Sequence, residues 1–282
     1  MFKRIVVGID GSPSSVNASK LALKIGGFLS IPVVGVHVID ARLLEESFIA
    51  DLAGVLGFTY YEGISAKVRG FLEKRGDAVL TEFSALGREL GARVSVVQVT
   101  GVPYRELVAQ ADAGDLMAVG RTGSKPIKGV LIGSSSEKVI RNAPCSVLLT
   151  PSEEREIRKV LCAYDGSASS RLALKICSSF RKLFGYEVKI LHVEEERKID
   201  LEEVGKIIGE DYELLTTTGF PEEKIVQTVE DIGIDMVFMG AFGKGGFREF
   251  FLGSVTSFVT HHLTVPVLLA KSRDRLSAGR NT

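Results

Sequence analysis

Short apolar runs alternate with longer amphipathic stretches along the chain. In the first half, the apolar runs lie near residues 3–9, 33–39, 94–100, 115–120 and 145–150. They are rich in Val and Ile and apolar throughout, which is typical of strands buried on both faces. Helical patterns lie between them, at 14–29, 64–90, 103–113 and 134–142. This alternation predicts an α/β fold in which parallel strands carry helices on both faces of the sheet.

The same pattern occurs a second time. The segment 3–12 (KRIVVGIDGS) has a counterpart at 158–167 (RKVLCAYDGS), and in each copy a His follows the Asp by 27 positions. The strands of the second copy are expected near 158–164, 187–193, 212–218, 234–240 and 265–270. Internal repetition of this length indicates a duplicated domain. We therefore expect domains over 1–150 and 158–271, a linker over 151–157 and a tail over 272–282.

The two copies differ most between their second and third strands. The first copy has 37 more residues there, including a long helical pattern, and we place the extra segment at about 41–76. Because this segment leaves the carboxyl end of a strand, it could cover a ligand crevice. A packing or dimer surface is the alternative. Its aromatic residues need cover of some kind, namely Phe48, Phe58, Tyr60 and Tyr61.

The composition favours a soluble globular protein over a nucleic-acid-binding or membrane protein. A chain of 282 residues, 45% apolar and 25% charged, suits two soluble globular domains. Its 35 basic residues balance 35 acidic ones, which gives no electrostatic case for nucleic acid or an anionic membrane as partner. No apolar run approaches the roughly 20 residues of a membrane helix. Three Cys without a close pairing motif favour buried thiols in a reducing, cytoplasmic setting.

The candidate chemistry follows the fourth strand of each copy. A glycine at a strand exit lets backbone amides approach a ligand. A Gly-Ser step at a helix start offers N–H groups, a hydroxyl and the positive end of the helix dipole. We predict that each copy holds the phosphates of a nucleotide there, although Ser134 with Glu137 also fits an ordinary capping box. The residues concerned are Gly120, Gly123, Gly133, Ser134 and Ser135, and Gly240, Gly243, Gly253 and Ser254.

Asp10 and Asp165 end the first strand of each copy and precede a Gly-Ser pair. A carboxylate at this place could accept hydrogen bonds from a ribose or help to hold Mg²⁺ on phosphates. The alternative is turn and capping chemistry at the start of the next helix. In open parallel sheets, ligands bind at the carboxyl edge where the strand order reverses. If the first and fourth strands are neighbours, Asp10 and Gly120 belong to one site.

Several enzyme motifs are absent from the sequence. There is no GxxxxGK[ST] phosphate loop, no GxGxxG followed by an acidic residue and no GxSxG. Neither a nucleophile–base pair nor a cluster with metal-ligand spacing is visible. We therefore predict no catalytic residue and no direct metal ligand, because a phosphate cradle without a positioned base binds better than it turns over. A slow ATPase or autophosphorylating enzyme, and a structural dimer module with empty sites, are the alternatives.

Taken together, these residues resemble the universal stress protein family in a tandem, two-domain form. The nucleotide motif of that family, Gly-x-x-Gly, nine residues, Gly-Ser/Thr, is matched by both sets of glycines. The Asp-Gly-Ser opening and the His-Val strand end are also similar. The resemblance covers nearly the whole chain except the extra segment and the tail.

The resemblance implies five-stranded parallel sheets in the order 3-2-1-4-5 and a regulatory or stress-response protein that binds ATP or AMP. Adenine would meet the backbone near Val38 and Val193, and the two aspartates would lie near ribose and phosphates, with Mg²⁺ when ATP is bound. The domains would pair through their last strands, 146–150 and 266–270, as a pseudo-dimer, and a homodimer of the whole chain stays open. Val255 stands opposite Ser135, so equal affinity of the two sites is not expected.

Overall fold

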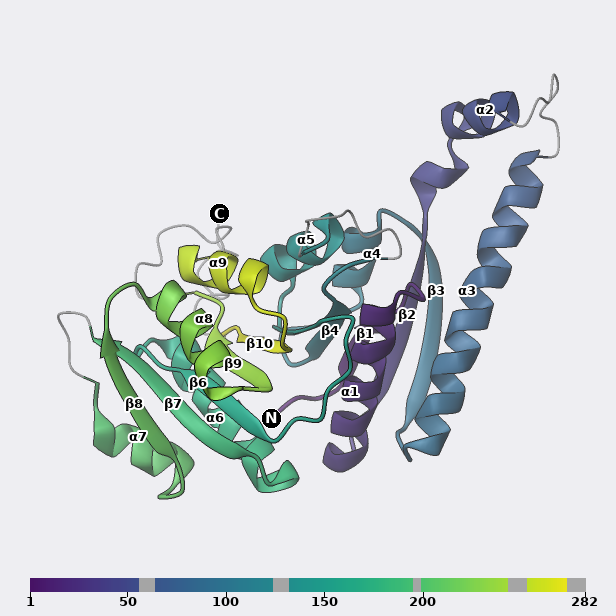
Figure 1. Cartoon of the computed structure of the whole chain (residues 1–282). Helices are drawn as coiled ribbons and strands as arrows, with labels where there is room; N and C mark the ends of the chain where they lie inside the picture. Colours follow the sequence, from purple (N-terminus) through teal and green to yellow (C-terminus); the bar gives the residue numbers. More distant parts are fainter. Residues whose placement is uncertain (56–63, 124–131, 195–198, 243–252, 273–282) are drawn as a thin grey trace, which may run out of the picture.

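The strands of both halves join in one ten-stranded sheet (Figure 1). The computed structural model describes residues 1–55, 64–123, 132–194, 199–242 and 253–272. The strands are β1 (Ile5–Gly8), β2 (Val33–Asp40), β3 (Val94–Gly101), β4 (Leu116–Gly120), β5 (Ser146–Thr150), β6 (Lys159–Ala163), β7 (Glu187–Glu194), β8 (Glu213–Thr218), β9 (Met236–Gly240) and β10 (Val267–Ala270). Their order across the sheet is β3-β2-β1-β4-β5-β10-β9-β6-β7-β8.

Helices cover both faces of this sheet. They are α1 (Pro13–Leu29), η1 (Ala41–Leu44), α2 (Glu46–Val55), α3 (Ile64–Glu89), α4 (Pro103–Ala109), α5 (Ser134–Asn142), α6 (Ala168–Phe184), α7 (Leu201–Ile208), α8 (Pro221–Ile232) and α9 (Ser254–His262). Side chains of α1, α3, α6 and α7 pack into the core on one face. Those of α4, α5, α8 and α9 pack on the other. The long α3 runs beyond the sheet, and α2 lies at its far end (Figure 1).

The strand order confirms the predicted fold. Within each half the strands are parallel and follow the order 3-2-1-4-5, so the first and fourth strands are neighbours. The two halves meet where β5 pairs with β10 in antiparallel fashion, with Leu148 opposite Leu268. The pairing through last strands that the family resemblance implies is therefore present within the chain.

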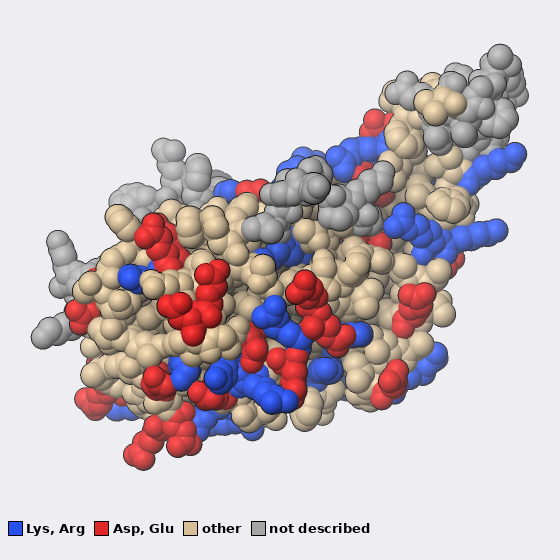
Figure 2. Space-filling model, viewed as in Figure 1, with Lys and Arg blue, Asp and Glu red and all other residues tan. Residues whose placement is uncertain are grey.

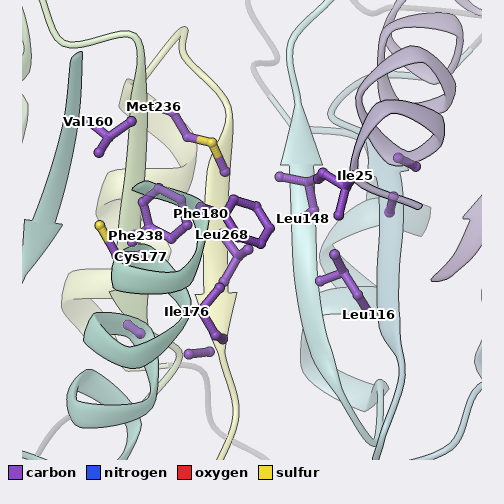
Figure 3. Close-up of a cluster of buried hydrophobic side chains, with 14 of the residues drawn as sticks. Ile25, Leu116, Leu148, Val160, Ile176, Cys177, Phe180, Met236, Phe238 and Leu268 are labelled. Carbon is purple, nitrogen blue, oxygen red and sulfur yellow. The ribbon is translucent and has the colours of Figure 1, made fainter. Parts of the chain in front are cut away.

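Alternate residues of the central strands enter opposite cores. Ile5 and Val7 belong to the core on one face and Val6 to the core on the other, and all three are fully buried. Leu148 and Leu268 are also fully buried and belong to the same core, so the core on this face continues across the junction between the halves (Figure 3). Burying one such side chain contributes about 1.5–3 kcal/mol, which makes the junction as firm as the interior of a domain.

The edge strands depart from the expected burial. The sequence predicts strands buried on both faces, but β3 and β8 consist of half-buried and exposed residues, and Val96 is 42% exposed. The prediction is wrong for these two strands because the order 3-2-1-4-5 places them at the ends of the sheet. No helix in the described part of the chain is long and apolar enough to cross a membrane. Acidic and basic side chains are mixed over the face shown in Figure 2.

Candidate functional site

The Asp-Gly-Ser segments form the same tight turn in both halves. The Oδ1 atom of Asp10 accepts a hydrogen bond from the Ser12 amide at 2.9 Å, and Asp165 Oδ1 accepts one from the Ser167 amide at 2.9 Å. The glycine between them is left-handed, with φ of +77° at Gly11 and +75° at residue 166, a conformation that favours glycine. The serine, rather than the aspartate, then caps the following helix, α1 or α6. The predicted turn chemistry is therefore present.

The second carboxylate oxygen of Asp10 faces the glycine loop. A Cβ atom built on Gly123 would lie 3.3 Å from Asp10 Oδ2. This proximity follows from the pairing of β1 with β4, which brings the ends of these two strands to one edge of the sheet. Asp165 occupies the corresponding place in the second half. Gly243, its expected partner, lies outside the described residues.

The first glycine of each motif has a packing reason. A Cβ on Gly120 would lie 2.3 Å from Ser14 Oγ and 2.7 Å from the Ser14 carbonyl carbon. A Cβ on Gly240 would lie 2.9 Å from the backbone nitrogen of Ser170. Glycine at these positions lets the first turn of α1 or α6 rest directly on the strand exit. The sequence interpretation named only the approach of a ligand.

The strand exit and the helix start of the first half are in contact. The Gly133 amide donates to the Arg121 carbonyl at 2.7 Å, and a Cβ on Gly133 would lie 3.5 Å from the Gly123 nitrogen. Ser136 Oγ donates to the Gly120 carbonyl at 2.7 Å, which ties the first turn of α5 to the end of β4. These contacts form a closed corner that a side chain at position 133 would fill.

The second half uses a related tie. Thr256 Oγ1 lies 3.3 Å from the Gly240 carbonyl and 3.1 Å from the Ala241 carbonyl, and it donates to them. Sequence reasoning missed both Ser136 and Thr256. The signal that could have found them is a hydroxyl three residues after the last motif glycine in each copy.

The helices that follow the glycine loops begin without a side-chain cap. Gly133 is the N-cap of α5 and Gly253 that of α9, and neither helix has a capping hydrogen bond from a side chain. The capping box considered for Ser134 is wrong, because Glu137 forms an ion pair with Arg141 at 2.7 Å instead. The predicted hydroxyl residues Ser134, Ser135 and Ser254 are exposed in the first turns. The amides and the dipole of each helix start are thus available to an anion.

Val38 and Val193 lie near the carboxyl ends of β2 and β7, and both are half-buried. The histidines beside them are buried and serve the fold. His37 Nδ1 lies 2.7 Å from the Ile9 carbonyl, and His192 Nδ1 lies 3.0 Å from the Tyr164 carbonyl. A carbonyl can only accept, so Nδ1 carries the proton in both rings. Each histidine joins the second strand of its half to the end of the first.

The extra segment of the first half reaches the edge of this corner. A Cβ on Gly11 would lie 3.1 Å from Val79 Cγ1 of α3, and Arg75 Nη2 donates to the Asp10 carbonyl at 3.5 Å. The buried residues of α3, namely Gly76, Leu80, Phe83 and Gly87, lie on the part of the helix that packs beside β2 and β3. Residues 65–75 are half-buried or exposed, so the role of the extra segment stays a prediction. Sequence reasoning did not name Arg75. Phe48 and Phe71 are exposed, and Phe58, Tyr60 and Tyr61 lie outside the described residues.

The corresponding edge of the second half is closed by paired charges. Glu203 of α7 accepts hydrogen bonds from Arg171 Nε at 2.6 Å and from Tyr164 Oη at 3.0 Å. The bond from Arg171 lowers the pKa of the Glu203 carboxyl. Burial, followed by the bond to Glu203, raises the pKa of Tyr164 to about 12. The charge of Arg171 is therefore balanced by the Glu203 carboxylate, whereas Arg75 donates to a backbone carbonyl.

Metal ligands and thiols add little chemistry. Within the described ranges, no group of three or more His, Cys, Asp or Glu side chains could hold a metal ion. Cys145, Cys162 and Cys177 are free and buried, and burial raises the pKa of Cys145 to about 12. A thiol in this state is a packing residue. The site can bind an anion through backbone amides and hydroxyls, and Asp10 can interact with a cation bound to that anion.

The chain matches known proteins over most of its length. The model of the Universal stress protein family matches residues 1–151 and 194–271. A universal stress protein of Synechocystis sp. is 28% identical, over 95% of this chain and 99% of the relative. A universal stress protein of Methanocaldococcus jannaschii is 29% identical, over 55% of this chain and 86% of the relative. The crystal structure of a universal stress protein from Archaeoglobus fulgidus has a TM-score of 0.72 at 22% identity, covering 95% of this chain and 98% of that one. The likeness to that structure is one of fold.

Proposed function

The chain belongs to the universal stress protein family, and on that premise we propose that each half binds an adenine nucleotide, ATP or AMP. The phosphates lie at the glycine loop and the first turn of the next helix, α5 or α9. In the first half the site comprises Gly120, Gly123, Gly133, Ser134 and Ser135. In the second half it comprises Gly240, Gly243, Gly253 and Ser254.

One observation carries this proposal. The corner at Gly133 has backbone on two sides, because a Cβ at this position would lie 3.5 Å from the Arg121 carbonyl oxygen and 3.5 Å from the Gly123 nitrogen. A branched side chain there would therefore cover the Gly123 amide. Beside it, α5 starts without a cap, so its amides point at the same region. Amides and a helix dipole that converge on an open corner favour a phosphate.

The aspartates extend the site toward the sugar and a cation. Asp10 uses Oδ1 for its turn, and Oδ2 faces Gly123. With ATP bound, this oxygen can interact with Mg²⁺ held by the phosphates, because hard cations prefer oxygen ligands. Asp165 has the same role in the second half. Adenine lies against the backbone near Val38 and Val193, at the ends of the second strands.

We propose a regulatory role in which nucleotide occupancy sets the conformation or the choice of partner. Hydrolysis needs a group that accepts a proton from the attacking water. His37 and His192 are buried against backbone carbonyls, which leaves them unsuited to this task. A stress-response protein that senses adenine nucleotides fits a site made of amides, hydroxyls and one carboxylate.

Mass spectrometry of ligand released from the purified protein, followed by calorimetry with ATP and AMP, tests the proposal. We expect two binding events. Gly133→Val should remove one and Gly253→Val the other, because the new methyl groups fill the corner. Gly205→Val is the matched control, since a Cβ there meets nothing within 4 Å. If the intact protein binds neither nucleotide, the proposal is rejected.

Incubation with ATP and magnesium distinguishes binding from turnover. We expect no ADP above the level of a protein-free control. Release of ADP, or phosphate added to the protein, that disappears when Ser134, Ser135 or Ser254 is changed to Ala would favour the enzyme instead.

A further inference from the structure

Arg121 lies inside the first glycine motif, and its backbone connects the end of the sheet with the start of α5. Its amide donates to the Thr150 carbonyl at 2.7 Å, which continues the pairing of β4 with β5. Its carbonyl accepts from the Gly133 amide at 2.7 Å, which holds the helix start against the strand exit. The backbone of this one residue therefore sets the distance between the two parts of the candidate phosphate site.

The side chain of Arg121 leaves its own half of the molecule. It is 4% exposed, and its Nη2 atom donates to the Val265 carbonyl at 3.1 Å, in the link between α9 and β10 of the second half. Its Nε atom has no hydrogen-bond partner among the described residues. Burial lowers the pKa of Arg121 to about 10, so the group is still charged at neutral pH. A buried cation is thus held by a carbonyl of the other half.

A charged group at this place is costly for the fold. Among the described residues no carboxylate pairs with Arg121, and a buried guanidinium recovers only part of its lost hydration from one carbonyl. The equivalent residue in the second half is Ala241, whose amide makes the corresponding bond to the Ala270 carbonyl at 2.9 Å. The architecture therefore does not need an arginine here. A role in fixing the loop explains its presence.

Lys271 makes the reverse crossing. Its Nζ atom donates to the Ala143 carbonyl at 2.7 Å, in the link between α5 and β5 of the first half. The same ammonium lies 5.7 Å from the ring centre of Phe242, a residue of the second glycine motif. Each glycine loop thus contacts a cation that is anchored on the opposite half. In the first half that cation belongs to the loop itself.

We propose that Arg121 is a positioning residue through which the second half holds the first glycine loop in its binding shape. The first nucleotide site is then complete only when the two halves are paired. This inference rests on the proposed nucleotide binding. Its structural part, the fixed loop, does not need a nucleotide to be measured.

Hydrogen exchange in the nucleotide-free protein tests the structural part. In Arg121→Met, we expect the Gly133 amide to exchange at least about fivefold faster, because the carbonyl that accepts it is no longer anchored. The Ala241 amide should be unchanged. Arg121→Lys should restore part of the protection, since an ammonium can also reach a carbonyl. Lys271→Met is the matched control and should leave Gly133 unchanged. Equal Gly133 exchange in wild type and Arg121→Met overturns the positioning role.

Calorimetry tests whether Arg121 also affects nucleotide binding at the first site. In a Gly253→Val background, which isolates the first site, we expect Arg121→Met to weaken ATP binding about tenfold and Arg121→Lys to weaken it less. Unchanged affinity despite faster exchange would overturn the claim that the loop shape serves the site. If the unmodified protein binds no adenine nucleotide, the proposed function fails, while the exchange result still decides whether Arg121 holds the loop.

Discussion

The two halves share one strand order but brace their glycine loops differently. In the first half, the Thr122 carbonyl accepts hydrogen bonds from Ser12 Oγ at 3.2 Å and from Ser14 Oγ, and Thr150 Oγ1 donates to the Ser14 carbonyl at 2.9 Å. Phe242 and Ala270 stand at the places of Thr122 and Thr150 in the second half. Among the described residues, no serine hydroxyl of the second half bonds to the Phe242 carbonyl.

This difference shows which parts of the motif the fold requires. Both halves keep the close packing at Gly120 or Gly240, the hydroxyl tie from the helix and the aspartate turn. Among the described residues, the first half alone adds polar braces, a crossing arginine and Arg75 from α3. Residues that are already held by such bonds, here residues 120–123, lose less entropy when a ligand binds. We therefore expect the first half to bind nucleotide more tightly than the second.

The largest effect is expected from Gly120→Val. Its Cβ would clash with Ser14, including backbone, so the first turn of α1 must move, at a cost of about 3 kcal/mol. Gly240→Val should cost less, because its closest contact is 2.9 Å rather than 2.3 Å. Urea unfolding of both variants measures the difference. Equal midpoints would mean that the two strand exits are packed alike.

Next in size is a pH effect that separates the two crossing cations. Burial lowers the pKa of Lys271 from 10.5 to about 8, with Cys145 beside it. Between these values the unfolded chain binds a proton that the folded chain does not, so Lys271 makes stability rise with pH above about 8. This rise is measured best between about pH 8 and 9, because above 9.0 the unfolded thiols begin to lose protons that the buried thiols keep. The slope is at most about 1.4 kcal/mol per pH unit.

Comparison of variants across this pH window identifies the group. Unfolding of Lys271→Met should lack this rise, whereas Arg121→Met should keep it. The Cys145 thiol acts in the opposite direction above pH 9, because burial raises its pKa from 9.0 to about 12 and only the unfolded chain then loses this proton. A rise of the same size in Lys271→Met would assign the effect to another residue.

Asp10→Asn and Asp165→Asn should each weaken binding of Mg²⁺-ATP to their own half by about tenfold, or about 1.4 kcal/mol. The amide oxygen of Asn can still form the turn, so the fold is kept while the charge is lost. AMP, which carries fewer phosphate charges, should be affected less. Calorimetry measures each site separately: the Gly253→Val background leaves only the first site, and the Gly133→Val background leaves only the second. An equal loss for ATP and AMP would point to the ribose rather than to a cation.

A smaller effect is expected from Arg75→Gln. We expect ATP binding to the first half to weaken about threefold at low salt and less at high salt, because an exposed guanidinium is screened. Arg171→Gln is the matched change in the second half and should produce no such loss, since Glu203 already neutralises that arginine. A salt-independent effect at Arg75 would indicate packing instead of charge.

The smallest effect should come from exchanging Ser135→Val with Val255→Ser. Each site would gain or lose one hydroxyl at the helix start, which is exposed at Ser135 and half-buried at position 255. We expect opposite changes of about twofold in nucleotide affinity, since the hydroxyl replaces water that can bind the same phosphate. If neither affinity moves, the unequal number of hydroxyls does not contribute to the difference between the halves.

The sequence by itself determined the duplication and the alternation of strands and helices, because buried strands and amphipathic helices leave local signatures. The strand order followed only from the resemblance to a family. It also named the glycines of the corner, but as places where a ligand approaches the backbone. The packing of Gly120 against the first turn of α1 was not predicted. The proximity of Asp10 to Gly123 could be predicted only on the condition that the first and fourth strands are neighbours in the sheet.

Only the tertiary structure decided how the corner is held. Arg121 and Lys271 look like ordinary loop and strand-end cations in the sequence, but the antiparallel junction of β5 with β10 turns each toward a carbonyl of the other half. Arg75 reaches Asp10 because α3 packs along the sheet beside it. These contacts join residues more than 60 positions apart in the sequence, and a local sequence pattern contains no information on contacts between such distant positions. Chain topology, rather than periodicity, places them.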